Sequence, residues 1–302
     1  VERERARLAE RIPAKRNNKD SYAVLRLVEE MCAYEPVAVG SLGSESGAEG
    51  VGYVALSKHY RQLISTSPIE LFYCGASGWD EIRSAFSEAL AQLPRGEICW
   101  DMGTDIRMNS VEEKPRVFRE SADLSQGKLA LGWRIGEWME NPDQAALTVF
   151  NSVFGGSASS KLFANVREKL SLCYYASSGA DIQKGLLLVS SAVNFENFGA
   201  AREEIFAQLE AMRRGEITPE ELESAKLSCS SALRSVEDDP LSLESYWLSM
   251  NVSGAEISPG ELAAACELVT AEDAADIARS CECDAEYYLC GKEDAADGPE
   301  ED

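Results

Sequence analysis

The stretch "FNSVFGGSASSKLFANVREKLSLCYYASS" (residues 150–178) joins two predicted helices to a predicted strand. The first helix is expected to end at Gly155 and Gly156, because glycine tolerates the left-handed backbone that often closes a helix. A short helix then runs over Ser159–Lys169, and the apolar run that follows it indicates a strand. The stretch therefore predicts a turn, a short helix and a strand in that order.

Two polar residues, Arg167 and Tyr174, lie seven positions apart across this helix–strand junction. On spacing alone, the commoner arrangement is an arginine at a helix surface and a tyrosine packed in the core. The alternative is a pair of polar groups that contacts a substrate.

The sequence around this junction predicts an α+β fold with a mostly antiparallel sheet. "QGKLALGWRI" (Gln126–Ile135) has strand character, and two further strands are predicted to pair around Asp181–Lys184. Longer helices are expected over Asn197–Arg214 and after the capping sequences that begin at Thr218 and Ser258. Strands come first, helices follow and a last strand closes the unit, an order typical of an α+β layer fold.

An internal repeat indicates two copies of one domain. "PIELFYCG" (Pro68–Gly75) is an apolar, strand-like segment that follows a predicted helix, Tyr53–Thr66. "DAEYYLCG" (Asp284–Gly291) is a second such segment, and it follows the predicted helix Ala271–Ser280. The two Cys-Gly pairs lie 216 positions apart, which is a domain-scale separation.

The repeat divides the chain into four parts. Residues 1–100 are predicted to be the C-terminal part of the first copy, 101–115 a linker, 116–293 the second copy, and 294–302 an acidic tail. The offset between copies puts the start of the first copy well before Val1. The first copy is therefore expected to lack its N-terminal strands and its first helix.

Composition excludes several classes of function. The chain has 52 acidic and 29 basic residues and a net charge of −23, so binding to nucleic acid is not expected. No apolar run reaches the roughly 18 residues of a membrane span. The nine cysteines are irregularly spaced, which favours the reducing cytoplasm over a disulfide framework. The closest group, Cys281, Cys283 and Cys290, lacks the C-x2-C spacing of zinc sites.

The chain contains a single histidine, His59. The zinc motifs H-E-x-x-H and H-x-x-E-H both need two histidines on one helical face, so these 302 residues supply neither. We therefore expect no metal or other cofactor to be bound by this chain, and no peptide hydrolysis by the chain alone.

Over several longer sequence segments, the chain resembles the insulinase/pitrilysin-like zinc metallopeptidases. The resemblance runs through residues 150–178, "KGLLLVSSAVNFEN" and "QLEAMRRGEITPEELESAK", and covers most of residues 117–291. With "NNKDSYAVLRLVEEMC" and "SPIELFYCG" it points to a bacterial subgroup of subunits that lack H-x-x-E-H. The resemblance implies a duplicated α+β unit, each copy with an antiparallel sheet flanked by helices.

The resemblance also implies a role for the two polar residues. In two-subunit members one subunit carries the zinc, and the other contributes an arginine and a tyrosine, in the pattern R-x6-Y, to its partner's active site. Arg167 and Tyr174 match that pattern here, and Gly155 and Gly156 would shape the turn before the short helix. Active members also carry E-x6-E on a helix that resembles "VERERARLAER". Seven positions after Glu4 this chain has Arg11, which would repel a metal ion.

Three functions follow as alternatives. The first is a non-catalytic subunit of a heteromeric zinc metallopeptidase that binds a peptide substrate and completes the site of a zinc-bearing paralogue. The second is a pseudo-peptidase that binds a peptide or protein without cleavage, as an accessory factor in peptide maturation or in modification of a translation factor. The third is a complete peptidase whose zinc motif lies upstream of Val1.

Overall fold

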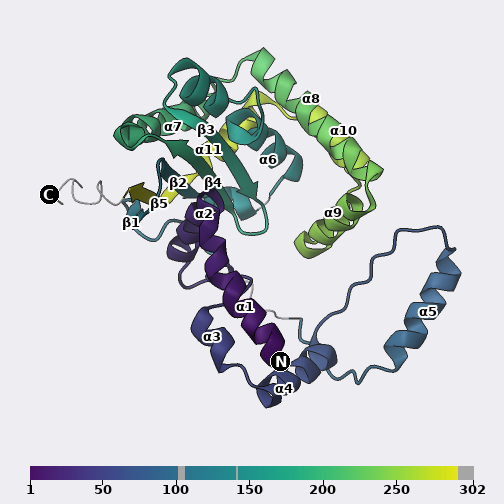
Figure 1. Cartoon of the computed structure of the whole chain (residues 1–302). Helices are drawn as coiled ribbons and strands as arrows, with labels where there is room; N and C mark the ends of the chain where they lie inside the picture. Colours follow the sequence, from purple (N-terminus) through teal and green to yellow (C-terminus); the bar gives the residue numbers. More distant parts are fainter. Residues whose placement is uncertain (101–105, 141, 292–302) are drawn as a thin grey trace.

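The computed structural model describes residues 1–100, 106–140 and 142–291, and it contains one five-stranded sheet with helices on both faces (Figure 1). The strands are β1 (Arg116–Ala122), β2 (Gly127–Arg134), β3 (Cys173–Asp181), β4 (Leu186–Val193) and β5 (Glu282–Gly291). The helices are α1 (Glu2–Ala14), α2 (Lys19–Met31), α3 (Glu45–Gly50), α4 (Tyr53–Thr66), α5 (Trp79–Ala91), α6 (Gln144–Asn151), α7 (Phe198–Arg213), α8 (Pro219–Ser235), α9 (Pro240–Ser253), α10 (Pro259–Leu268) and α11 (Ala271–Ser280). Shorter helical segments are η1 (Lys15–Asn17), η2 (Pro36–Ala38), η3 (Gly136–Glu140), η4 (Ser152–Gly156), η5 (Leu162–Lys169), η6 (Phe195–Asn197) and η7 (Val236–Asp238).

The strand order across the sheet is β1-β5-β2-β4-β3. Only β1 and β5 pair in parallel among these strands, and the other three neighbours are antiparallel. The predicted α+β fold with a mostly antiparallel sheet is therefore confirmed. The predicted pairing around residues 181–184 is also confirmed, because β3 and β4 form a hairpin there.

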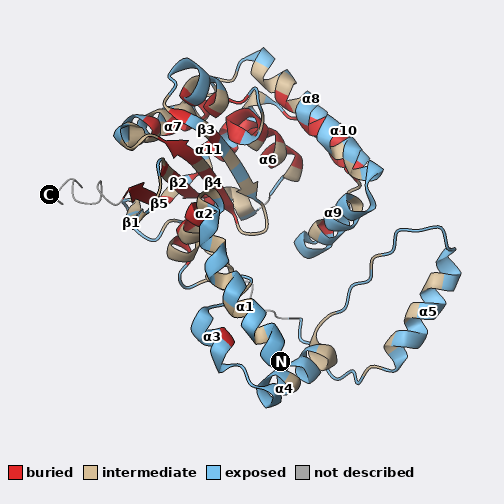
Figure 2. Cartoon of the chain, viewed as in Figure 1, coloured by how far each residue is buried: buried red, intermediate tan, exposed pale blue. Residues whose placement is uncertain are grey.

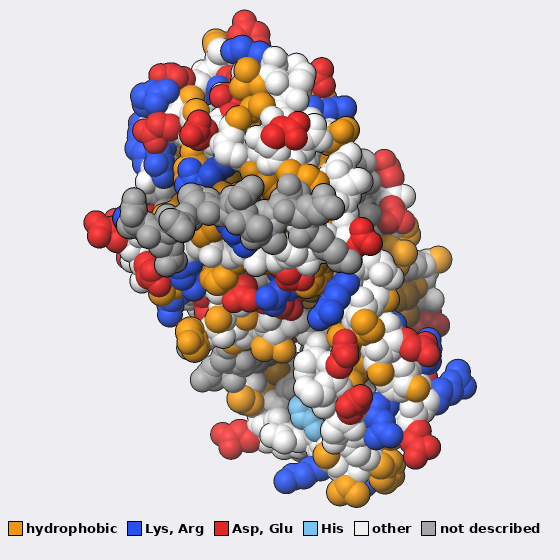
Figure 3. Space-filling view, turned by 60° about the vertical axis from the view of Figure 1, so that its left-hand side comes forward, with side chains coloured by type: hydrophobic (Ala, Val, Ile, Leu, Met, Phe, Trp, Pro, Cys, Tyr) orange, Lys and Arg blue, Asp and Glu red, His pale blue; other side chains and the backbone are white. Residues whose placement is uncertain are grey.

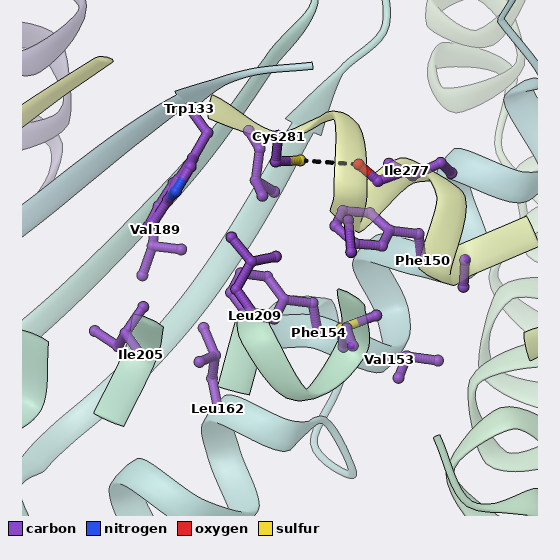
Figure 4. Close-up of a cluster of buried hydrophobic side chains, with 14 of the residues drawn as sticks. Trp133, Phe150, Val153, Phe154, Leu162, Val189, Ile205, Leu209, Ile277 and Cys281 are labelled. Atoms are coloured by element: carbon purple, nitrogen blue, oxygen red, sulfur yellow. Dashed lines mark hydrogen bonds between the residues drawn. The ribbon is translucent and has the colours of Figure 1, made fainter. Parts of the chain in front are cut away.

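The larger core lies on one face of the sheet, under α6, α7 and α11. Figure 4 shows Phe150, Phe154, Ile205 and Leu209 gathered in one cluster below Trp133 of β2. All of these side chains are almost completely buried. Burial of one such side chain stabilises the folded state by about 1.5–3 kcal/mol, so this layer holds the helices on the sheet.

Helix α2 covers the opposite face of the sheet. Its residues Ala23, Leu27 and Met31 recur every four positions, so they lie on one helical face, and all are buried against β2, β4 and β5. A side chain at Gly132 of β2 would begin 2.4 Å from the Met31 sulfur. Glycine at this position therefore allows the helix to approach the sheet closely.

A buried ion network fixes the end of α2. Arg134 of β2 is completely buried and donates to Asp284 of β5 at 3.0 Å and to Glu35 at 2.6 Å. Arg116 of β1 donates to the other Asp284 oxygen at 2.8 Å and to the carbonyl of Met31 at 2.9 Å. Three strands and the segment after α2 therefore share one set of charges.

The expected helix caps are mostly present. Thr218 and Ser258 each form a capping box with the glutamate three positions later, which confirms both predicted helix starts. Helix α6 is different, because Asp143 is its N-cap and accepts from the backbone amides of residues 145 and 146. We expected Asn141 to be this cap. Asn141 lies outside the described residues, and the helix begins two positions later than predicted.

The strand expected at Pro68–Gly75 is wrong. This segment has no regular structure, and Leu71 and Tyr73 are exposed, whereas its repeat partner in β5 is a buried strand of the sheet. A strand needs a neighbour for its backbone hydrogen bonds. The described residues before Arg116 form helices and loops only, so none pairs with this segment, and Figure 2 shows α3–α5 largely exposed.

The predicted division into residues 1–100, a linker at 101–115 and a second copy at 116–293 stays a prediction. All strands of the described residues lie between Arg116 and Gly291, but α2 packs on that sheet. The predicted acidic tail, 294–302, lies outside the described residues.

Candidate functional site

The candidate site is built on η5, a π-helical segment held tightly against its neighbours. Leu162 and Val166 are completely buried in the core. Lys161, just before the segment, donates to both carboxylate oxygens of Glu221 on α8 at 2.9 Å. Asn165 donates to the side chain of Gln208 on α7 at 3.0 Å. Two helices and the core thus fix this segment, and its remaining face is exposed.

Arg167 lies on that exposed face. Its side chain is 42% exposed, and its guanidinium lies 4.7 Å from the centre of the Phe163 ring. The nearest carboxylate is that of Glu168 at 3.6 Å, an ion pair of small energetic value at an exposed position. The Phe163 ring orients the guanidinium without occupying its hydrogen-bond donors.

Tyr174 lies at a β-bulge in the edge strand β3. Cys173 pairs with Val193 and Tyr175 pairs with the adjacent Ala192, so Tyr174 is the extra residue. A bulge changes the direction of a side chain, and Tyr174 is 56% exposed.

The next residue, Tyr175, has a different environment. Its hydroxyl donates to Asp20 of α2 at 2.8 Å and lies 3.0 Å from the Ser190 hydroxyl. Burial raises the pKa of Tyr175 well above its ordinary value. Of the two adjacent tyrosines, Tyr175 therefore links the sheet to α2, and Tyr174 presents its phenol to solvent.

Arg167 and Tyr174 are brought to the same region by the turn between η5 and β3. Ser171 has a positive φ of 51°, a conformation that only a few non-glycine residues adopt. The two elements pack against each other. Burial raises the pKa of Cys173, while a contact with Ser191 and the charge of Arg167 oppose this shift.

Gly155 and Gly156 end the π-helical segment η4, and the chain becomes extended at Ser157. The left-handed conformation expected for them is wrong, because neither has a positive φ. Glycine is instead required at both positions because a larger residue would have no room for its side chain. A side chain at Gly155 would begin 2.7 Å from the backbone nitrogen of Ser178, and one at Gly156 would begin 2.9 Å from the carbonyl oxygen of Asn151. Gly155 lets η4 lie directly against β3, and Gly156 leaves room for the Asn151 carbonyl at the end of α6.

Sequence reasoning missed the groups that orient the pair. The bulge at Tyr174, the Phe163 ring under Arg167 and the turn at Ser171 all depend on tertiary packing. The adjacent tyrosines were the one visible signal. Alternation along a strand sends neighbouring side chains to opposite faces, so one of the two was bound to differ from the other in burial.

Within the described ranges, no group of three or more His, Cys, Asp or Glu side chains is placed to hold a metal ion. The single histidine, His59 on α4, is exposed, and a histidine is visible at the surface in Figure 3. On the face drawn there, Lys and Arg side chains lie among Asp and Glu. Of the helices described, none has the length and apolar character needed to cross a membrane.

Comparisons with known proteins agree on one family. Residues 52–229 match the family model described as the peptidase M16 inactive domain. The chain is 31% identical over 298 residues to the probable inactive metalloprotease YmfF of Bacillus subtilis (strain 168), covering 98% of this chain and 68% of that protein. It is 33% identical over 150 residues to the uncharacterized zinc protease YmxG of the same strain, covering 47% of this chain and 34% of that protein.

A solved structure shares the fold. A conserved protein from Enterococcus faecalis V583 matches with a TM-score of 0.83 at 26% identity, covering 96% of this chain and 68% of that one. This chain therefore corresponds to about two thirds of the length of YmfF and of the Enterococcus protein. It belongs to the peptidase M16 family, the insulinase/pitrilysin-like metallopeptidases that its sequence resembles, and it matches the inactive domain of that family.

Proposed function

We propose that this chain is a non-catalytic subunit of a heteromeric zinc metallopeptidase, and that Arg167 and Tyr174 contact the scissile peptide in the active site of a zinc-bearing paralogue. The observation that carries the proposal is the bulge at Tyr174, which presents the phenol to solvent at a sheet edge, on a strand that packs against the segment carrying Arg167. A structural tyrosine would be expected to resemble Tyr175, which is half buried and hydrogen bonded on both sides.

The chemistry suits a peptide carbonyl that gains negative charge during hydrolysis. A zinc ion in the partner supplies Lewis-acid chemistry. On this chain, the Arg167 guanidinium stays charged and offers several N–H donors, and the Tyr174 hydroxyl donates one hydrogen bond. Both groups would stabilise the developing oxyanion more than the ground-state carbonyl, and such differential binding accelerates a reaction.

The sheet edge offers a second element of substrate binding. Among the described strands, β3 pairs with β4 alone and lies at the end of the strand order. Its free edge can accept an extended peptide as an added strand, while Arg167 and Tyr174 act at one end of that strand. The substrate is therefore a peptide in extended conformation.

The partner is a paralogous subunit that carries the zinc ligands. YmxG is named a zinc protease and is related to this chain over 150 residues, so partners of that kind exist within the family. A cytoplasmic location follows from the irregular cysteine pattern of the sequence.

The rival function is a pseudo-peptidase that binds a peptide or protein and supports no cleavage. The free edge of β3 favours it equally, because binding by strand addition needs neither Arg167 nor Tyr174. YmfF is named a probable inactive metalloprotease, which agrees with either function.

The test is co-purification of the chain with a zinc-bearing paralogue, followed by assays of peptide binding and peptide cleavage. The proposal expects a stable complex that cleaves peptide faster than either chain alone. It also expects Arg167→Ala and Tyr174→Phe to slow cleavage with little change in peptide binding. Cleavage unaffected by both substitutions, with binding retained, would establish the rival. Two chains that never associate would contradict the proposal.

A further inference from the structure

The residues on either side of the bulge in β3 are fixed on opposite faces of the sheet. Cys173 packs in the larger core, on the face that α6 covers. Tyr175 reaches the other face, where its hydroxyl donates to Asp20 of α2 at 2.8 Å. In a regular strand, residues two positions apart point to the same face. The extra residue, Tyr174, therefore separates two parts of β3 that are held on different faces.

Asp20 is held in place by its own helix and by the middle of the sheet. It lies in the first turn of α2, where the helix dipole favours a negative charge. The ammonium of Lys128 on β2 lies 2.8 Å from the carboxylate oxygen that accepts from Tyr175, and the Lys128 side chain is only 12% exposed. The Asp20 carboxylate therefore joins α2, the central strand β2 and Tyr175 at one point.

Two serines of β4 complete the contacts of Tyr175. An ionised carboxylate only accepts hydrogen bonds, so the Tyr175 proton is donated to Asp20. The Ser190 hydroxyl, 3.0 Å from the Tyr175 oxygen, is then the donor of the second bond. The Ser191 hydroxyl is completely buried and donates to the Tyr175 carbonyl at 2.8 Å. Both the side chain and the backbone of the residue after Tyr174 are thus fixed.

From this arrangement we propose that Tyr175 is a positioning residue for Tyr174, and that Asp20 acts through Tyr175. The Tyr174 phenol forms no hydrogen bond of its own within the described part of the chain, so its direction depends on the backbone that carries it. Fixing the residue that follows a bulge fixes that backbone. Helix α2, which precedes residue 100, therefore sets the geometry of a site formed by residues after 115. The catalytic consequence rests on the function proposed above, whereas the positioning does not.

The direct test of positioning is a fluorine label on Tyr174. Fluorotyrosine is incorporated at this position alone, and the fluorine NMR spectrum of the whole chain is recorded. The wild type should give a single resonance, and Tyr175→Phe should broaden or split it, because only the anchoring hydroxyl is lost. Tyr246→Phe is the matched control, because it removes a hydroxyl on α9 that donates to the Ile257 carbonyl at 2.8 Å. It should leave the Tyr174 resonance unchanged.

Two variants of Asp20 test the acceptor. Asp20→Asn keeps an oxygen that accepts from Tyr175, so it should keep the single resonance. Asp20→Ala should broaden or split the resonance, as Tyr175→Phe does. Thermal unfolding checks that every variant is folded at the temperature of the spectra. The inference is overturned if Tyr175→Phe leaves the Tyr174 resonance as it is in the wild type, or if the wild type already gives several resonances.

The complex with a zinc-bearing paralogue tests the catalytic consequence. Tyr175→Phe should lower the single-turnover rate constant about 10-fold with little change in the Kd of the peptide, because a misplaced donor affects the transition state more than binding. Combined with Tyr174→Phe, it should cause no further loss, because the group that it positions is already absent. Fully additive losses would overturn the inference, since Tyr175 would then act independently of Tyr174.

The positioning and the proposed function fail in different ways. If Tyr175→Phe changes the Tyr174 resonance but neither it nor Tyr174→Phe slows cleavage, the positioning stands and the proposed function is contradicted. If Tyr174→Phe slows cleavage while Tyr175→Phe matches the wild type in both spectrum and rate constant, the function stands and the positioning is overturned.

Discussion

At the scale of single residues, the site depends on close contacts that tolerate little change. Gly155 is the clearest example, because a side chain there would meet a backbone nitrogen that cannot move aside. The same contact brings η4 against β3, the strand that carries Tyr174. Gly155, which has no side chain that could take part in a reaction, therefore helps to set the position of the strand that carries Tyr174.

Gly155→Ala is expected to lower the free energy of unfolding by about 1–3 kcal/mol, the cost of overpacking a tight contact. Urea denaturation of the variant and of the wild type measures this difference in the free energy of unfolding. Gly179→Ala, in strand β3, is the matched control, because nothing lies within 4 Å of its added methyl group. Equal stability of the two variants would show that the contact at Gly155 is looser than described.

Arg134 gives a second prediction at this scale. Arg134→Leu leaves Glu35 and Asp284 without their shared partner, so we expect a loss of about 3–5 kcal/mol of stability. Arg214→Leu removes an arginine from the exposed pair with Glu216 and should change the free energy of unfolding far less. Chemical denaturation of both variants measures the stability that each loses. If Arg134→Leu loses as little stability as Arg214→Leu, Arg134 does not fix α2.

The sequence predicted the identity of the candidate residues but not their geometry. The R-x6-Y spacing pointed to Arg167 and Tyr174 through resemblance to a family. Nothing in "SLCYY" distinguished Tyr174 from Tyr175, because the bulge that separates them arises from the pairing of β3 with β4. Their role in catalysis stays a prediction.

At the scale of elements, helix α2 is held on the sheet by carboxylates with perturbed acidity. Burial would raise the pKa of Glu35, but hydrogen bonds from Arg134 and from the Arg107 backbone hold it below its ordinary value of 4.5. Burial would also raise the pKa of Asp20. The hydrogen bonds from Lys128 and Tyr175 outweigh this effect and hold the pKa of Asp20 below its ordinary value. Both carboxylates are therefore more acidic in the folded chain than in the unfolded chain.

A carboxylate whose pKa is lower in the folded chain stabilises the fold at pH values above its unfolded-state pKa. That stabilisation is lost as the pH falls through its folded-state pKa. The free energy of unfolding should therefore decrease as the pH falls below about 4.5, and Glu35→Gln should make that decrease shallower. Denaturation at a series of pH values measures the slope. Glu203→Gln, an exposed change on α7, should keep the wild-type slope, and an unchanged slope in Glu35→Gln would argue against the prediction.

Elements defined by local chemistry were predicted well. The capping boxes at Thr218 and Ser258 and the β3–β4 hairpin formed as expected, because their signals lie within a few residues of each other. The segment Pro68–Gly75 has the same local pattern as β5 but forms no strand. Strand formation needs a neighbour, and a local pattern does not report whether one is present.

At the scale of the whole molecule, α2 joins the N-terminal part of the chain to the sheet. Its apolar face and the Arg134 network both cross from the residues before 100 to those after 115. In contrast, the connection between α4 and α5 is irregular and exposes apolar side chains such as Tyr73.

Limited digestion with chymotrypsin is therefore expected to cut first near Phe72 and Tyr73. The fragment that carries α2 should then co-elute with the fragment that carries the sheet on size exclusion, because the α2 contacts survive the cut. Met31→Asp, which places a charge in those contacts, should release the fragment. Spontaneous separation of the wild-type fragments would show that α2 is not firmly docked.

In the proposed function, this chain contributes Arg167 and Tyr174 to catalysis in a partner's active site. The most direct test is the single-turnover rate constant for peptide cleavage by the complex with its zinc-bearing paralogue, at saturating enzyme. Tyr174→Phe and Arg167→Ala should each reduce that rate constant on the order of 100-fold, the usual effect of removing one oxyanion donor. Lys169→Ala, in the same π-helical segment, should leave it within about 2-fold of wild type. Equal rate constants for Arg167→Ala, Tyr174→Phe and wild type would contradict the claim.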